Sequence, residues 1–100
     1  MKKKDFKILL VDDEPDIIEI IRFNLEQQGY EICTASDGLE ALKVAKKELP
    51  HLIIMDVMMP GGIDGLETTR RIRQIPELNK CAIIMLTAKG QKADIEAGKK

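Results

Sequence analysis

Short runs of apolar residues, each closed by acids, glycine or proline, recur along the chain and predict its strands. Residues 52–55 form one such run, followed by Asp56 and then by the turn sequence Pro60-Gly61-Gly62. An unbroken apolar run of this length is typical of a strand buried on both faces of a parallel sheet. Asp56 is therefore predicted at the carboxyl end of a central strand, the edge where open α/β sheets bind ligands. Further strands are predicted at 7–11, 30–35 and 81–87.

The first predicted helix begins at Pro15 and ends before Gly29. Proline suits the first helical turn, where its missing N–H is no loss, and glycine is favoured just beyond a helix end. Asp13 or Glu14 is placed to cap the helix or to face its positive N-terminus. Several apolar residues share one helical face and are predicted to pack on the sheet. They are Ile17, Ile18, Ile21 and Leu25.

Three more helices are predicted, over residues 37–49, 64–75 and 93–100. The first of these starts with Asp37 and Glu40, whose spacing predicts a capping box, and a proline follows its end. Proline also follows the end of the second. The side chains expected to point inward are Leu39, Leu42, Val44, Ala45 and Leu49 in the first, and Leu66, Thr69 and Ile72 in the second.

Strands and helices alternate in the order β-α-β-α-β-α-β, so each strand follows the last through a helix-length connection. Such connections join parallel strands and are right-handed. The predicted fold class is therefore α/β, a doubly wound parallel sheet in the order 2-1-3-4 with helices on both faces. Cys33 and Cys81 would lie on strands roughly 14 Å apart. Because a disulfide does not span such a distance, both are expected to be free thiols.

The chain has 100 residues, enough for one domain, and 16 basic against 17 acidic residues give a net charge of -1. This balance argues against a protein that binds nucleic acid through charge alone. No apolar stretch approaches the roughly 20 residues needed to cross a bilayer, and no secretory leader is recognised. A cytoplasmic protein without membrane contact is expected. Arg70, Arg71 and Arg73 crowd one predicted helix and are interpreted as a solvated face.

Three carboxylates are predicted to meet at the carboxyl edge of the sheet. Asp12 and Asp13 follow the first strand and Asp56 ends the third, and these strands are neighbours in the predicted order. Carboxylates so close together repel one another strongly. Helix capping by Asp13 and solvation of Asp12 would explain each acid alone, but a hard-oxygen site for Mg²⁺ explains all three. The backbone carbonyl of Met58 is the expected further ligand.

A carboxylate beside Mg²⁺ is able to attack phosphorus and form an acyl phosphate. The cation neutralises charge on the transferring oxygens, while the protein positions the groups. Thr87 ends the strand beside Asp56, where its hydroxyl would hydrogen-bond a phosphoryl oxygen, although an ordinary strand threonine is the simpler interpretation of that residue alone. Ala88 after it leaves room for a phosphoryl group. These positions together indicate a site at which a carboxylate is able to accept a phosphoryl group.

Three segments resemble the receiver domain of two-component response regulators, in order and spacing, over nearly the whole chain. They are Val11-Asp12-Asp13-Glu14-Pro15, Asp56-Val57-Met58-Met59-Pro60 with the later Asp64-Gly65, and Leu86-Thr87-Ala88-Lys89-Gly90. The resemblance implies a flavodoxin-like fold. It implies that Asp56 is the phosphoacceptor, that Asp12 and Asp13 hold Mg²⁺, and that Thr87 is the switch hydroxyl.

The same resemblance implies how the chain is used. The donor would be a phosphohistidine on a sensor histidine kinase or a histidine phosphotransferase, with the first helix as a main docking surface. The chain would be a regulatory phosphoacceptor that assists its own phosphorylation and dephosphorylation, not an enzyme with its own substrate. A DNA-binding output domain often follows such receivers, but no direct nucleic acid binding is expected of residues 1–100.

Two features depart from the family pattern. Gly61, Gly62 and Ile63 separate the proline from the Asp-Gly pair, where the family usually has two residues, so altered phosphorylation or dephosphorylation kinetics are expected. The family's fifth strand, the lysine at its end and the last helix have no recognised counterpart, and neither Lys99 nor Lys100 is assigned that lysine's role. Residues 1–100 are therefore interpreted as a receiver domain truncated before its fifth strand. The fourth strand would then have an unpaired apolar edge that favours self-association.

Other interpretations of the acid cluster stay open at this point. A Mg²⁺-dependent phosphatase of the haloacid dehalogenase kind also uses an aspartyl nucleophile, but Asp56-Val57-Met58 lacks the second acid of that family. A flavin-binding module has the same topology, but the acidic loop after the first strand repels phosphate. An inert fragment of a receiver domain is the third alternative.

Overall fold

The computed structural model describes residues 5–59 and 63–86, together with the backbone of 93–95. None of the helices in these ranges is long and apolar enough to cross a membrane. The strands are β1 (Lys7–Val11), β2 (Glu31–Ala35), β3 (Leu52–Asp56), β4 (Ala82–Leu86) and β5 (Ala93–Ile95). The helices are α1 (Pro15–Gln27), α2 (Gly38–Glu48) and α3 (Gly65–Arg73), and a 3-10 turn covers Pro76–Leu78.

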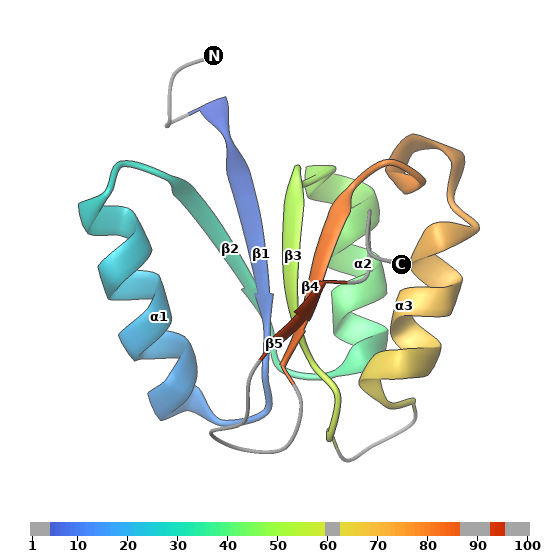
Figure 1. Cartoon of the computed structure of the whole chain (residues 1–100), viewed down its shortest axis with the longest axis horizontal. Coiled ribbons are helices and arrows are strands. Elements are labelled where there is room, and N and C mark those ends of the chain that lie inside the picture. Colours follow the sequence, from blue (N-terminus) through green and yellow to red (C-terminus); the bar gives the residue numbers. More distant parts are fainter. Residues whose placement is uncertain (1–4, 60–62, 87–92, 96–100) are drawn as a thin grey trace.

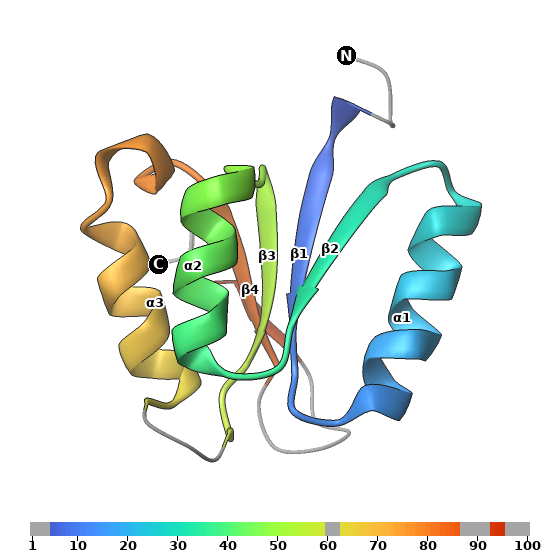
Figure 2. The same cartoon turned by 180° about the vertical axis from the view of Figure 1, so that it is seen from behind.

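One sheet runs through the molecule in the order β2-β1-β3-β4-β5. The first four of its strands in the sequence pair in parallel, so the predicted order 2-1-3-4 is confirmed. Helix α1 covers one face of the sheet, while α2 and α3 lie together on the other (Figure 1 and Figure 2). The carboxyl ends of the parallel strands therefore meet at one edge, between the two helical layers.

The segment after β4 differs from the prediction. The sequence predicts a helix from Ala93, but residues 93–95 form β5, which pairs antiparallel with β4 and sets Ile84 opposite Ile95. The helix prediction is wrong for residues 93–95, because β4 presents a row of unpaired backbone groups on this edge and a strand satisfies them. Residues 96–100 of the predicted helix lie outside the described residues. The expected unpaired edge of β4 is wrong for the same reason, which weakens the basis of the predicted self-association.

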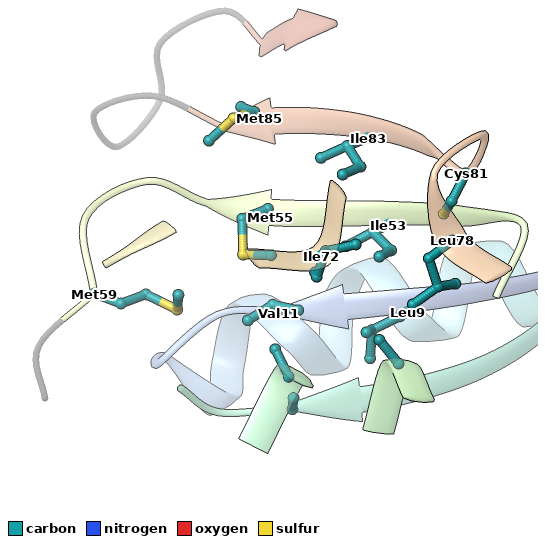
Figure 3. Close-up of a cluster of buried hydrophobic side chains, with 13 residues drawn as sticks. Leu9, Val11, Ile53, Met55, Met59, Ile72, Leu78, Cys81, Ile83 and Met85 are labelled. Carbon is teal, nitrogen blue, oxygen red and sulfur yellow. The ribbon is translucent and has the colours of Figure 1, made fainter. Parts of the chain in front are cut away.

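The main core lies between the sheet and the layer formed by α2 and α3. Alternate strand residues on this face are buried, and Figure 3 shows them gathered around Ile72 of α3 and Leu78 of the 3-10 turn. Because one face of the parallel strands packs in this core, a slip of one residue in the strand register would expose it. The residues of the parallel strands in the core are Leu9, Val11, Ala35, Ile53, Met55, Ile83 and Met85.

The predicted inner face of α2 is confirmed for Leu42, Val44 and Ala45, which lie in or against this core, and is wrong for Leu39 and Leu49. Ala41 and Ala45 are fully buried, whereas Leu39 and Leu49 are 51% and 46% exposed. The helix packs against both the sheet and α3, and the face that it turns toward them carries Ala41 and Ala45. In α3, Leu66 also points outward, with 59% of its surface exposed.

Two helices begin with a side-chain cap, and the cap by Asp37 is the one that the sequence predicts. Oδ1 of Asp37 accepts a hydrogen bond from the N–H of Glu40 at 2.8 Å, and Oε1 of Glu40 accepts one from the N–H of Ser36 at 2.9 Å. At the start of α3, Oδ1 of Asp64 accepts from the N–H of Glu67 at 2.9 Å. These bonds satisfy amide groups that have no partner inside the helix, and so they fix where α2 and α3 begin.

Helix α1 is a looser cover than α2. None of its residues is fully buried, although its predicted inner face is half-buried against β1 and β2. Its outer face exposes Ile20 and Phe23 to 59% and 61%. The helix therefore carries apolar surface on the side that faces solvent.

Both cysteines are free, as predicted. Cys33 lies on β2 and Cys81 directly precedes β4, so β1 and β3 separate them. Burial raises the pKa of each thiol to about 11. Both are therefore protonated at neutral pH and act as packing residues.

Candidate metal centre

Three acidic side chains meet at the carboxyl edge of the sheet. Val11 pairs with Met55 in the register of β1 and β3, so the residues that follow them, Asp12 and Asp56, lie level with each other. One carboxylate oxygen from each of Asp12, Asp13 and Asp56 lies within 4.8 Å of the other two. The structure thus brings together the three acids that the sequence analysis expects to find there.

The acid cluster is largely shielded from water. Asp12 is 8% exposed and Asp56 is 9% exposed, while Asp13 is half-buried. Burial raises the pKa of Asp12, and the charge of Asp13 raises it further, although a hydrogen bond from the N–H of Glu14 acts in the opposite direction. Because like charges repel strongly in a shielded site, the fully ionised cluster is costly unless a cation joins it.

Backbone amides orient two of the three carboxylates. Oδ1 of Asp12 accepts from the N–H of Glu14 at 2.9 Å, and Oδ1 of Asp56 accepts from the N–H of Met58 at 3.2 Å. Each bond closes a short turn that holds the side chain over its own loop. Glu14 occupies the N-cap of α1 without a side-chain capping bond, so the predicted capping by Asp13 or Glu14 is wrong. The reason is that Asp13 joins the acid cluster instead.

Oδ1 of Asp13 is a buried acceptor that no donor among the described residues reaches. Such an atom is costly when it is left without a partner, and a bound cation would satisfy it. Together with the nearby oxygens of Asp12 and Asp56, it provides the all-oxygen set of few carboxylates that Mg²⁺ prefers. The residues present therefore fit the predicted metal.

Two hydrogen bonds hold the main chain that follows Asp56. The N–H of Val57 donates to the carbonyl of Leu86 on β4 at 3.0 Å, and the carbonyl of Val57 accepts from the N–H of Gly65 at 3.1 Å. Gly65 also packs against the carbonyl oxygen of Asp56. From the sequence, Gly65 is expected only near the start of a helix. A glycine directly after a good capping residue, where alanine would favour the helix more, is the signal that marks it.

Other predicted site residues are placed only in part. The side chain of Met58 is 64% exposed and its amide faces Asp56, but ligation by its carbonyl stays a prediction. Thr87 and Ala88, together with Gly61 and Gly62 of the longer loop, lie outside the described residues. The roles assigned to them therefore also stay predictions.

A hollow of about 310 Å³ opens beside Asp12 and Asp13. Its walls include Ile18 and Arg22 of α1 and Thr34 near the end of β2. The hollow lies along α1 and reaches Asp12 and Asp13, whereas Asp56 does not line it.

A family model described as the response regulator receiver domain matches residues 8–100. The alkaline phosphatase synthesis transcriptional regulatory protein PhoP of Bacillus subtilis is 49% identical over 88 residues, which are 88% of this chain and 35% of that protein. The phosphate regulon transcriptional regulatory protein PhoB of Rhizobium meliloti is 43% identical over 88 residues, covering 88% of this chain and 38% of that protein. This chain spans little more than a third of the length of these relatives.

Solved structures share the fold. The chemotaxis response regulator CheY4 of Vibrio cholerae has a TM-score of 0.80 at 37% identity, over 86% of this chain and 71% of that one. The response regulator TrrA of Thermotoga maritima, solved in complex with Mg²⁺ and BeF, has a TM-score of 0.75 at 45% identity, over 85% of this chain and 71% of that one.

Proposed function

The chain belongs to the response regulator receiver domain family, and from this premise we propose that it is the phosphorylated switch of a two-component system. Residues 1–100 are one receiver domain in this proposal, a regulatory phosphoacceptor that assists its own phosphorylation and dephosphorylation. The observation that carries the proposal is the meeting of three carboxylates, with oxygens within 4.8 Å, at the ligand-binding edge of the sheet.

Asp56 is the proposed phosphoacceptor. It ends the central strand, and its Oδ1 is held by the N–H of Met58. A carboxylate oxygen of Asp56 gives an electron pair to phosphorus while the bond from phosphorus to the donor histidine nitrogen breaks. The electrons of that bond pass to the imidazole nitrogen, and the product on this chain is an aspartyl phosphate. Thr87 is the proposed switch hydroxyl, which would donate a hydrogen bond to the phosphoryl group.

Asp12, Asp13 and Asp56 are the proposed ligands of Mg²⁺, with the backbone carbonyl of Met58 as a further ligand. When bound, the cation offsets the charge of the acids and of the phosphoryl oxygens. The raised pKa of Asp12 supports this assignment, as does Oδ1 of Asp13, a buried atom that no described donor reaches. Both features are relieved by a positive charge, because it favours ionised carboxylates.

The proposed donor is a phosphohistidine on a sensor histidine kinase or a histidine phosphotransferase. Helix α1 is the proposed docking surface, because its exposed Ile20 and Phe23 offer apolar contact area. The hollow beside Asp13 also leads along this helix to the acid cluster. We place the chain in the cytoplasm and assign no nucleic acid or membrane contact to residues 1–100. Self-association stays a prediction.

Incubation with Mg²⁺ and acetyl phosphate, followed by intact mass spectrometry, tests the proposal. The wild-type chain is expected to gain one phosphoryl group, as the bond from phosphorus to the acetyl oxygen breaks and acetate leaves. Asp56→Asn is expected to gain none, and chelation of Mg²⁺ is expected to prevent the gain in the wild type. Asp37→Asn is the matched control, because this aspartate caps α2 outside the acid cluster and asparagine also caps.

Two outcomes would contradict the proposal. One is a wild-type chain that gains no phosphoryl group although it is folded. The other is an Asp56→Asn variant that gains a phosphoryl group as fast as the wild type. Repeated turnover of p-nitrophenyl phosphate by the wild type would instead indicate the phosphatase alternative.

A further inference from the structure

The first residue of α3 lies directly behind the proposed phosphoacceptor. A Cβ atom placed on Gly65 would overlap the carbonyl oxygen of Asp56, and it would lie 2.9 Å from the carbonyl carbon of Asp56 and 2.8 Å from Cα of Val57. All of these are backbone atoms, so no side chain is able to rotate away and make room. Even a methyl group at this position must therefore move the main chain of Asp56 or displace α3.

Gly65 is required for space and not for an unusual backbone angle. Gly29, with a φ of 98°, is the glycine that adopts a left-handed conformation among the described residues. A glycine at the start of a helix otherwise costs stability, because alanine favours the helix by about 1 kcal/mol. The close approach of α3 to the chain after Asp56 accounts for glycine here.

Hydrogen bonds hold the two backbones in this contact. The N–H of Gly65 donates to the carbonyl of Val57 at 3.1 Å, and the N–H of Val57 donates to Leu86 of β4 at 3.0 Å. On the helix side, the Asp64 carboxylate accepts from Glu67 at 2.9 Å, so the first turn of α3 has a fixed start. A shift of α3 would therefore also shift the main chain that carries the Asp56 carboxylate.

We infer that Gly65 is a positioning residue that sets the Asp56 carboxylate relative to Asp12 and Asp13. This inference rests on the proposed function and deepens it. Asp56 pairs with Leu86 in the ladder of β3 and β4, so pressure from a side chain at position 65 would tilt the end of β3 within its ladder. Sites of this kind depend on placement to within about half an ångström. A displaced carboxylate would bind a divalent cation more weakly and accept phosphorus more slowly.

Gly38 provides a matched control for the damage that a new methyl group does to packing. It is the first residue of α2 as Gly65 is of α3, and it is also buried. A Cβ atom there would overlap Oγ1 of Thr68 and would lie 2.6 Å from Cγ1 and 2.9 Å from the carbonyl oxygen of Ile63. None of these atoms belongs to Asp56 or Val57. Gly38→Ala therefore strains the contacts of α2 with Thr68 of α3 and with Ile63 of the preceding loop, and it does not press on the main chain of Asp56 or Val57.

The experiment compares Gly65→Ala and Gly38→Ala with the wild type in three measurements. Urea unfolding gives stability, titration calorimetry with Mg²⁺ alone gives the dissociation constant, and intact mass after acetyl phosphate gives the phosphorylation rate. Both variants are expected to lose stability. At a temperature where circular dichroism shows all three to be folded, only Gly65→Ala is expected to bind Mg²⁺ about tenfold more weakly and to be phosphorylated roughly 10- to 100-fold more slowly.

A second pair of variants tests the same inference if Gly65→Ala does not fold. Asp64→Ala removes the side-chain cap of α3 and adds no bulk. Without that cap, the first turn of α3 is held less firmly behind Asp56. Asp37→Ala removes the corresponding cap of α2. A loss of Mg²⁺ affinity confined to Asp64→Ala is expected, smaller than that in Gly65→Ala.

The results separate this inference from the proposed function. If the wild type is phosphorylated but Gly65→Ala and Gly38→Ala retain the same Mg²⁺ affinity and rate as each other, the inference is overturned while the proposed function stands. If Asp64→Ala and Asp37→Ala lose Mg²⁺ affinity equally, the inference about Gly65 is likewise overturned. If the folded wild type is not phosphorylated at all, the proposed function fails, and the inference fails with it.

Discussion

Arg73 and Cys81 are joined by a hydrogen bond of 2.6 Å, in which Nη1 of the arginine donates to the main-chain carbonyl of the cysteine. The same nitrogen lies 3.2 Å from the carbonyl oxygen of Asn79. The end of α3 is thereby tied to the residue that precedes β4. The solvated face predicted for the three arginines of α3 is therefore wrong for Arg73, which turns back onto the chain that follows its helix.

Replacing Arg73 with methionine is expected to lower the free energy of unfolding by about 1.5–3 kcal/mol, the range for hydrogen bonds to charged groups. Methionine keeps much of the aliphatic stem but loses the donors, which leaves the carbonyl of Cys81 without this partner. Arg70→Met is the control, because Arg70 pairs with Glu67 at the surface and its loss is expected to cost at most about 1 kcal/mol. Equal losses for the two variants in urea unfolding would contradict the prediction.

Leu49 ends α2 in the left-handed conformation, with a φ of 48° and a ψ of 61°. This conformation costs a residue with a Cβ atom roughly 1–2 kcal/mol, and glycine avoids that cost. Leu49→Gly is expected to raise the free energy of unfolding by about 1 kcal/mol, since the leucine is 46% exposed and loses only part of its packing. Leu49→Ala removes the same side-chain contacts but keeps a Cβ atom at the left-handed φ angle. Thermal unfolding of this variant is therefore expected to show no gain in stability over the wild type.

Glu67 accepts hydrogen bonds from Arg70 at 2.6 Å and from Arg71 at 2.8 Å, and these hold the pKa of its carboxyl at about 2, below the usual 4.5. Because the folded pKa is lower than the unfolded one, the interaction stabilises the fold above pH 4.5 and is lost as the pH falls toward 2. The difference in unfolding free energy between wild type and Glu67→Gln is expected to shrink over this range, and also in high salt. A difference that does not vary with pH would argue against the ion pair.

The strand order and the meeting of the acids could be predicted from the sequence because both depend on short local signals. Strands β1, β3 and β4 are compact apolar runs, and Asp12 and Asp56 lie at the carboxyl ends of neighbouring parallel strands. Once the topology is known, the carboxyl ends of those strands have only one edge at which to meet. This part of the fold and of the site needed no knowledge of side-chain packing.

The features that the sequence analysis missed depend on contacts between distant segments. Leu39 is more hydrophobic than Ala41, yet Ala41 is the buried one, because α2 turns the face that carries Ala41 toward the sheet and α3. The strand at residues 93–95 forms because β4 offers it a partner, which no local pattern of polar residues reveals. Gly65 is similar, since its sequence context marks a helix start but not the backbone that lies against it.

Asp13 makes the proposed metal site testable through stability alone. Its Oδ1 is buried where no described donor reaches it, and its charge lies within a cluster of three acids. In the presence of a chelator, Asp13→Asn removes a like charge from that cluster. The unfolding free energy of the variant is therefore expected to exceed that of the wild type, by on the order of 1 kcal/mol.

Added Mg²⁺ is expected to reverse that order. A cation that binds only the folded state stabilises it by about 2.7 kcal/mol when its concentration is 100 times the dissociation constant. Asp13→Asn lacks one of the three carboxylates, so Mg²⁺ should raise its unfolding free energy much less. The wild type then becomes the more stable chain. Asp37→Asn, which keeps the cluster intact, should gain as much as the wild type. The measurement is urea unfolding with chelator and with Mg²⁺. The same order in both conditions would mean that the folded chain does not use Asp13 to bind the cation.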